Sequence, residues 1–253
     1  IDASQSGAKN LLERGIPVSV SRRGFSPAVA EMALTLILAS LRRTSNFHHA
    51  MWNGSESWVN QYPDDIDPDE RQLTGRRVGL VGFGGIGQRL GQLLAPFECD
   101  IKIHDPFLPD EVAKQAGVEN VSLNELMTHS EILVLCAAAN EGTKHIITRE
   151  HIEALAPKSV FVNVCRASLV DSQALLERLQ RGDFYAALDV FDREPLEADS
   201  PLRKLPNVYL TPHRAGGIME STQRIVQYLV DDLRAWRKGE PRRHVLSEAM
   251  IPS

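Results

Sequence analysis

The sequence is poor in cysteine, carries no excess of positive charge and has no long apolar run. Its three cysteines, Cys99, Cys136 and Cys165, are widely spaced and odd in number, so a reduced, cytoplasmic setting is expected rather than a disulfide framework. The formal net charge of −5 gives no electrostatic basis for binding nucleic acid or an anionic membrane. The most apolar run, residues 32–41, is too short to cross a bilayer. No signal peptide is visible, and no histidine spacing is that of a zinc site, so no metal is expected.

The composition is otherwise that of an ordinary globular protein, with 253 residues, 43% of them hydrophobic and 24% charged. Its most informative stretch is rich in glycine. An apolar run at residues 78–81 predicts a short buried strand, and a helical pattern follows at 88–95. Between them, Gly82, Gly84 and Gly87 fit the pattern G-x-G-x-x-G.

Each of these glycines has a physical role in binding a dinucleotide. The first permits a tight turn, the second lets a pyrophosphate approach the backbone, and the third lets the helix pack close to the strand. Free N–H groups at the start of the helix, including those of Gly85 and Ile86, would then meet the phosphates.

Asp105 ends the next strand-like run, 18 residues after Gly87. A carboxylate at that position of a dinucleotide fold accepts hydrogen bonds from the adenosine ribose and repels a 2′-phosphate. The expected cofactor is therefore NAD. The alternative is a plain glycine turn followed by a solvated Asp105.

Strand and helix patterns alternate from residue 75 onward. The predicted strands are 77–81, 101–104, 132–136, 160–164, 184–188 and 208–210, and the predicted helices between them are 85–95, 109–115, 122–127, 148–155 and 171–181. This alternation predicts an α/β fold, a doubly wound parallel sheet with helices on both faces. The strands at 132–136 and 160–164 are continuously apolar, as expected for strands buried on both faces.

Further elements are expected outside the alternating region. They are a helix at 7–14, a strand at 16–20, a long helix from 28 to beyond 47, a polar loop at 54–71 and a last amphipathic helix at 218–238. The first half of the long helix is apolar nearly all round, so it must be covered by the protein's own core or by a partner subunit.

Three side chains suited to hydride transfer, Arg166, Glu194 and His213, each follow a predicted strand. Ligands of an open parallel sheet bind at the carboxyl ends of its strands. An arginine can bind the carboxylate of a 2-keto acid and polarise the neighbouring carbonyl. A histidine can donate the proton that the new alkoxide needs, and a glutamate beside it would orient the imidazole and favour its charged form.

Taken singly, each of these residues has an ordinary structural interpretation. Arg166 could be a surface ion-pair partner, Glu194 with Pro195 could be loop chemistry, His213 could end a strand in a turn, and Asp189 could cap a turn. Together, at consecutive strand ends behind a dinucleotide turn, they favour a catalytic site. The other histidines are expected to be structural or solvated.

With these residues in place, the chain resembles the D-isomer-specific 2-hydroxyacid dehydrogenase family. The resembling motifs are 82–87, 163–171, 187–191 with Glu194-Pro195, and 211–213, together with 26–33 and 41–43. The resemblance implies that Arg166, Glu194 and His213 are catalytic, that Asp189 accepts from the nicotinamide carboxamide and that Asp105 binds the ribose. It implies further cofactor contacts from Ala137, Thr143, Cys165 and Gly216.

The same resemblance implies a homodimer paired through the helix predicted at 28–47. Formate dehydrogenases of the family carry an amide at the position of Glu194, which argues against formate as the substrate. The chain departs from the family pattern at Ala167, where glycine is usual, at residues 138–140, where Pro-Leu-Thr is usual, and at Arg214, where an apolar residue is usual.

The family also has a smaller, flavodoxin-like substrate lobe, which is incomplete in this sequence. Residues 24–214 are expected to form the NAD-binding domain, and residues 1–23 and 215–253 the remnants of that lobe. We therefore expect an NAD-dependent oxidoreductase that acts on a small D-2-hydroxy acid or its 2-keto form, of the phosphoglycerate, hydroxypyruvate or glyoxylate class. The alternative is an NAD(H)-sensing, corepressor-like binding protein of the same fold without turnover.

Overall fold

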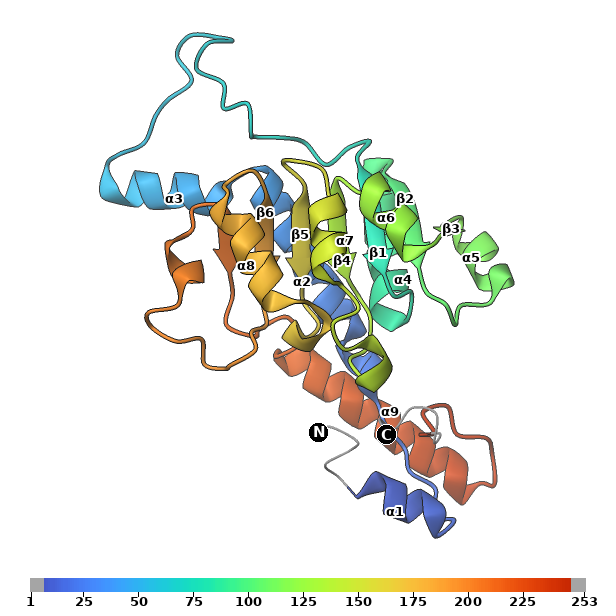
Figure 1. Cartoon of the computed structure of the whole chain (residues 1–253). Coiled ribbons are helices and arrows are strands. Elements are labelled where there is room, and N and C mark those ends of the chain that lie inside the picture. The colour runs from blue at the N-terminus through green and yellow to red at the C-terminus, as the bar shows by residue number, and fades with distance from the viewer. Residues whose placement is uncertain (1–6, 247–253) are drawn as a thin grey trace.

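The computed structural model describes residues 7–246, and its centre is a single parallel sheet (Figure 1). The strand order is β3-β2-β1-β4-β5-β6-β7, and every neighbouring pair is parallel. The strands are β1 (Arg77–Val81), β2 (Asp100–His104), β3 (Glu119–Asn120), β4 (Ile132–Leu135), β5 (Val160–Asn163), β6 (Tyr185–Leu188) and β7 (Val208–Leu210). The order reverses between β1 and β4, which confirms the doubly wound fold and places its ligand-binding edge.

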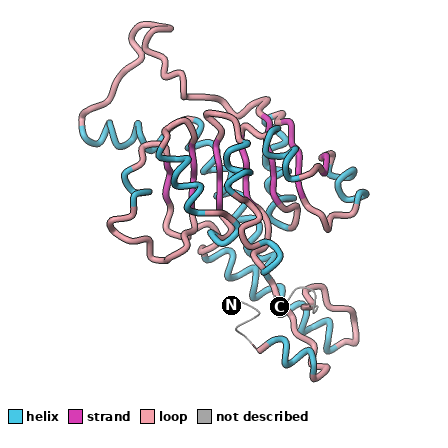
Figure 2. The backbone as a smooth tube through the Cα atoms, viewed as in Figure 1, coloured by secondary structure: helices cyan, strands magenta, loops and turns pink. Residues whose placement is uncertain are grey.

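Helices cover both faces of the sheet (Figure 2). One face carries α6 (Leu123–His129), α7 (Arg149–Ala154) and α8 (Ser172–Gln180), and the other carries α2 (Ser26–Leu41) and α4 (Gly85–Leu94). α5 (Asp110–Ala116) packs beside β3 at the edge. Short 3-10 helices are η1 (Arg22–Phe25), η2 (Ala95–Phe97), η3 (Glu141–Thr143), η4 (Ala167–Leu169) and η5 (Pro201–Lys204).

The core lies between these layers. All residues of β4 and β5 are buried, which confirms that their continuous apolar runs belong to strands covered on both faces. The apolar helix α2 packs on β5, β6 and α4, and Ala30, Ala33 and Ile37 have no exposed surface. Residues Arg23–Leu41 have the length and composition to cross a membrane, but burial in this core accounts for their apolar character.

The predicted single helix from 28 to beyond 47 is wrong, because the chain turns at Arg43. Arg43 has a left-handed backbone (φ 48°), and a separate helix α3 (Thr44–Asn53) begins after it. Residues of the following loop hold this turn: Arg42 pairs with Glu70, 2.6 Å apart, and Arg43 pairs with Asp67. The break therefore depends on contacts with a distant loop. No glycine or proline near Arg43 indicates it in the sequence.

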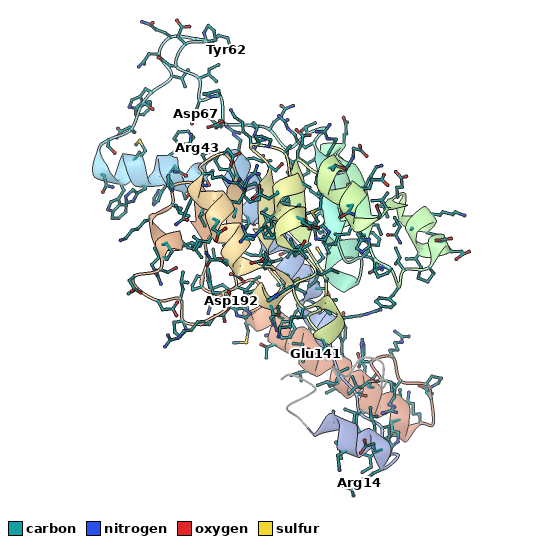
Figure 3. The ribbon with its side chains drawn as sticks, in the orientation of Figure 1. Arg14, Arg43, Tyr62, Asp67, Glu141 and Asp192 are labelled. Carbon is teal, nitrogen blue, oxygen red and sulfur yellow. The ribbon has the colours of Figure 1, made fainter. Side chains whose placement is uncertain are left out.

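The loop that begins at residue 54 extends away from the body of the molecule, as predicted from its polar sequence. Figure 3 shows Tyr62 at its far end and Asp67 where the chain returns to Arg43. Within the described residues, this loop forms no helix or strand up to β1.

A small second cluster lies at the other end of the molecule, where α1 (Ala8–Glu13) lies near α9 (Met219–Arg237) (Figure 1). Its apolar residues are Ala8, Leu12, Val18, Val20 and Leu246. The strand predicted at 16–20 is wrong, because only Ser19 forms a bridge, antiparallel to Val245. Asp232 organises this cluster: its buried carboxylate accepts from the Ser19 hydroxyl (2.8 Å) and from the N–H groups of Arg243 (2.9 Å) and His244 (3.1 Å). These bonds join two segments that the sequence keeps far apart.

Candidate active site

The glycine turn joins β1 to α4 at the edge where the carboxyl ends of the strands meet. Gly82 has a left-handed backbone (φ 90°), and a Cβ on it would lie 2.7 Å from the backbone of Ala137 at the end of β4. A Cβ on Gly87 would lie 2.5 Å from the carbonyl oxygen of Gly82. Any larger residue at either position would push the turn apart, so the structure gives both glycines the roles that their spacing predicts.

The geometry of this turn fits a dinucleotide. The space over Gly84 is open, since a Cβ there would meet nothing within 4 Å. The first N–H groups of α4, from Gly85 onward, have no acceptor within the helix, and they form the positive end of the helix dipole. A pyrophosphate bound here would satisfy these donors without moving the backbone.

Asp105 follows β2 and lies next to the turn. Its Oδ2 accepts from the Phe83 N–H (2.9 Å), and its Oδ1 accepts from the Phe107 N–H (3.0 Å). A carboxylate has about four lone-pair positions, so two remain for ribose hydroxyls. The aromatic ring of Phe107 is 88% exposed beside it.

His213 and Glu194 meet directly, as expected from their positions after β7 and β6. His213 Nδ1 lies 2.6 Å from Glu194 Oε2, and Glu194 Oε1 accepts from the Phe191 N–H at 3.0 Å. Partial burial raises the pKa of the Glu194 carboxyl, but the hydrogen bonds from His213 and Phe191 and the charges of His213 and Arg166 outweigh it, so its pKa lies below the ordinary value. The carboxylate therefore stays ionised beside the imidazole at neutral pH.

Arg166 follows β5 on an exposed turn, near enough for its charge to act on Glu194. Asn163 fixes this turn: its Nδ2 donates to the Arg166 carbonyl (2.9 Å) and its Oδ1 accepts from the Cys165 N–H (3.0 Å). The thiol of Cys165 donates to the Leu135 carbonyl (3.1 Å), and burial raises its pKa to about 12. Cys165 is therefore a neutral packing residue of the turn and no nucleophile.

Asp189 is completely buried and holds the segment that carries His213. Its Oδ1 accepts from the Thr211 hydroxyl (2.6 Å) and the Arg214 N–H (2.8 Å), and its Oδ2 accepts from the Ala215 N–H (2.9 Å). These three bonds leave about one lone-pair position of the carboxylate without a donor. The contact that the resemblance implies stays a prediction.

Two other predicted cofactor contacts have structural partners of their own. The hydroxyl of Thr143 donates to the Ala138 carbonyl (2.8 Å) and accepts from the Asn140 N–H (2.9 Å), so it shapes the loop after β4. A Cβ on Gly216 would lie 3.0 Å from the Phe25 ring, so Gly216 lets the segment after His213 pack against η1.

The sequence patterns gave no role to two residues that position the site, Asn163 and Thr211. A signal was present for the first, because Asn163 is the one polar residue of the otherwise apolar β5. The hydrogen bond from Thr211 to Asp189 joins the residues that directly follow the neighbouring strands β7 and β6. A pattern within one strand cannot predict such a pair.

The fold and the site define a dinucleotide-binding protein of the Rossmann type. Residues 34–215 match the family described as "D-isomer specific 2-hydroxyacid dehydrogenase, NAD binding domain". The chain belongs to this family, and its cofactor is NAD.

Curated relatives show how much of a longer protein the chain represents. It is 33% identical to the D-3-phosphoglycerate dehydrogenase of Methanocaldococcus jannaschii, over 95% of this chain and 45% of that relative. It is also 33% identical to the hydroxypyruvate reductase of Thermotoga maritima, over 87% of this chain and 70% of that one. The chain thus spans less than half of the first of these proteins and 70% of the second.

Solved structures share the fold closely. The D-mandelate dehydrogenase of Rhodotorula graminis superposes with a TM-score of 0.86 at 26% identity, covering 97% of this chain and 72% of that one. An acyclic imino acid reductase in complex with NADPH and D-Arg superposes with a TM-score of 0.80 at 25% identity, covering 95% of this chain and 74% of that one.

Proposed function

We propose that this protein is an NAD-dependent oxidoreductase that interconverts a small D-2-hydroxy acid and its 2-keto acid. One observation carries the proposal: the His213–Glu194 pair, with Nδ1 and Oε2 2.6 Å apart, lies at the carboxyl edge of the sheet that also bears the glycine turn. A proton donor and a dinucleotide site at one edge are what reduction of a carbonyl requires.

Proton transfer falls to His213. Its Nδ1–H donates to Glu194, which leaves Nε2 as the nitrogen that faces a substrate. In the charged imidazole, Nε2–H gives its proton to the carbonyl oxygen as the bound nicotinamide supplies a hydride to the carbonyl carbon. Glu194 stays ionised because its pKa is lowered, and its negative charge stabilises the imidazolium between turnovers.

Arg166 binds the substrate in this proposal. Its guanidinium donates to the Cys165 carbonyl (2.6 Å) in the structure. Its other N–H groups form no hydrogen bond with residues 7–246 and can bind a carboxylate through two parallel hydrogen bonds. The same charge polarises the adjacent carbonyl. The turn that carries it is fixed by Asn163, so Arg166 is presented at a defined place relative to His213.

The test is oxidation of NADH by the intact chain with a panel of 2-keto acids: glyoxylate, hydroxypyruvate, its 3-phosphate, and larger aromatic acids. Turnover is expected with at least one of them. Replacing His213 by Gln should lower kcat about a thousandfold and leave NADH affinity unchanged, because the proton donor is lost while the dinucleotide site is untouched. NADH binding without turnover on any keto acid would refute the dehydrogenase and favour a nucleotide-sensing protein.

The keto acid that is reduced most efficiently identifies the substrate class. NADPH should bind more weakly than NADH, because the Asp105 carboxylate repels a 2′-phosphate.

We further propose a homodimer formed through α3 and the loop after it. Large apolar side chains project there into solvent: Trp52 is 81% exposed, Trp58 64% and Tyr62 82%. An exposed apolar patch of this kind marks an interaction surface. Pairing through α2 stays a prediction as well: much of its apolar surface is buried against the chain's own sheet, while Met32, Leu34 and Leu38 are half-buried.

Sedimentation velocity tests this assembly. The unmodified protein should sediment as a dimer, and the double substitution W52S with W58S should sediment as a monomer with an unchanged circular dichroism spectrum. A monomer before substitution would refute the dimer and would leave the proposed chemistry untouched.

A further inference from the structure

An arginine outside the glycine turn lies directly beside it. A Cβ built on Gly85, the first residue of α4, would lie 3.7 Å from Cγ of Arg23 and 2.5 Å from Oγ of Ser26. The central carbon of the Arg23 guanidinium is three bonds beyond Cγ, so the side chain is long enough to reach the space in front of the first N–H groups of α4. The Arg23 side chain is exposed, and among residues 7–246 it forms no hydrogen bond or ion pair.

The backbone of Arg23 is held firmly in this place. Arg23 is part of η1, and a Cβ on its neighbour Gly24 would lie 2.5 Å from the Ile225 side chain of α9. Arg224 Nη1 donates to the Gly24 carbonyl at 3.0 Å, and the Phe25 ring packs against Gly216. Because α9 and the segment after His213 both fix η1, the position of Arg23 relative to the turn is a property of the fold.

Positive groups meet at this place, so it would attract an anion. The first residues of α2 and α4, Ser26 and Gly85, touch, so the positive ends of two helices meet. Neither helix has an acidic residue in its first turn. Arg23 adds a full positive charge to these two helix ends. Elsewhere in the described chain, many arginines pair with carboxylates, such as Arg76 with Glu131 and Arg149 with Glu177.

We propose that Arg23 binds the pyrophosphate of the cofactor, together with the N–H groups of the glycine turn. The glycine turn supplies backbone donors and partial charges, and Arg23 supplies a full positive charge that offsets part of the negative charge of the pyrophosphate. The proposal deepens the proposed function, because it rests on NAD as the cofactor, and it assigns to η1 a direct part in binding it.

The test compares two arginine substitutions in the intact chain. Arg23→Met removes the proposed contact and keeps the length of the side chain. Arg89→Met removes the same charge from α4 itself, one turn further on, where Arg89 donates to Gln92 at 3.2 Å. Dissociation constants are measured by NADH fluorescence, and by competition with ADP and with adenosine, which shares the nucleoside and lacks phosphates.

Arg23→Met should raise the dissociation constants of NADH and of ADP about tenfold, as expected for one hydrogen bond to a charged group, and leave that of adenosine unchanged. Arg89→Met should change none of them. Arg23→Lys keeps the charge, so its dissociation constants for NADH and ADP should lie between those of Arg23→Met and of the unmodified protein. Added salt should reduce the difference in affinity between Arg23→Met and the unmodified protein.

Two results would overturn the inference: NADH affinity in Arg23→Met equal to that in Arg89→Met, or an equal loss for ADP and adenosine. Absence of NADH binding in the unmodified chain would overturn it as well. A protein that binds NADH but reduces no keto acid would refute the proposed function alone, since the comparison of Arg23 with Arg89 requires binding only.

Discussion

His213 has an unusual backbone for a residue expected to transfer protons. Its φ of 52° lies in the left-handed region, where a non-glycine residue is uncommon and costs about 1 kcal/mol or more. The three hydrogen bonds that Asp189 accepts from the segment 211–215 hold this conformation. The buried carboxylate thus stabilises a strained residue whose side chain must face Glu194.

Replacing Asp189 by Ala should lower the free energy of unfolding by about 3 kcal/mol, because buried N–H donors would lose their acceptor. Urea unfolding measures this. Asp192→Ala is the matched control, since Asp192 is exposed and lies three residues after Asp189 in the loop that follows β6. It should change the free energy of unfolding by less than about 0.5 kcal/mol. Equal stability of the two variants would show that Asp189 does not hold the segment.

Replacing Glu194 by Gln should lower kcat roughly 100-fold at neutral pH, because the amide cannot stabilise the imidazolium. The pKa of Glu194 lies below its ordinary value, so its contribution to the rate is present at neutral and mildly acidic pH and is lost as pH falls through that lowered pKa. The pH profile of kcat should therefore show an acid limb that Glu194→Gln lacks. An identical acid limb in the variant would assign that titration to another group.

At the scale of elements, two of the three glycines of α4, Gly87 and Gly91, have opposite surroundings. A Cβ on Gly87 would lie 2.5 Å from the Gly82 carbonyl oxygen, whereas a Cβ on Gly91 would lie 3.6 Å from the Phe83 ring, an ordinary contact. The start of α4 can therefore pack this close to the end of β1 because residue 87 is a glycine. Gly91 lies in the interior of the helix and has room for a methyl group, and alanine has the higher helix propensity there.

Gly87→Ala should lower the free energy of unfolding by about 1–3 kcal/mol through overpacking and weaken NADH binding. Gly91→Ala should raise it by about 0.5–1 kcal/mol and leave binding unchanged. Thermal unfolding measures the stability of both variants, and titration with NADH measures their affinity for the cofactor. A loss of stability in Gly91→Ala, with none in Gly87→Ala, would contradict the structure.

Most elements of the sheet could be predicted from the sequence because they are long, apolar and regularly spaced. The runs at 132–136 and 160–164 became β4 and β5 with a shift of one residue at the end. β3 has two exposed residues and pairs only with β2, so no apolar pattern could reveal it. The turn at Arg43 and the loss of the strand at 16–20 are set by distant contacts, which local propensity does not contain.

The candidate site was predictable to a similar degree. The pairing of His213 with Glu194 follows from their places at the ends of β7 and β6. The bonds of Asp189 do not follow, because the expectation of a cofactor contact says nothing about the segment that the carboxylate holds in the free protein. Arg23 was not singled out, since its proximity to Gly85 depends on how η1 is held by α9.

At the scale of the whole molecule, Asp232 joins the two ends of the described chain. Its carboxylate is buried, and burial raises its pKa, but the N–H donors of Arg243 and His244 and the Ser19 hydroxyl outweigh burial and lower it. A lowered pKa means that this carboxylate stabilises the fold above the ordinary pKa of an aspartate and that the contribution is lost as pH falls through the lowered value.

Asp232→Asn should therefore weaken the cluster of α1 and α9 at neutral pH and change it little in strong acid. Hydrogen exchange of the amides of Val20 and Leu246, which bond across this cluster, should become faster in the variant at neutral pH. Asp231→Asn, on the neighbouring exposed position, is the control and should leave exchange unchanged. Faster exchange in both variants would mean that helix charge, and not the buried carboxylate, stabilises the cluster.

The bond between Ser19 and Asp232 also sets an order of events during translation. The two residues are 213 positions apart, and a ribosome that adds about 5–20 residues per second needs roughly 10–40 s to deliver the second after the first. Residues 8–20 leave the exit tunnel before the sheet is made, yet their partners are synthesised after it. Leu12 and Val18 therefore stay uncovered until the chain that includes Leu246 has been synthesised.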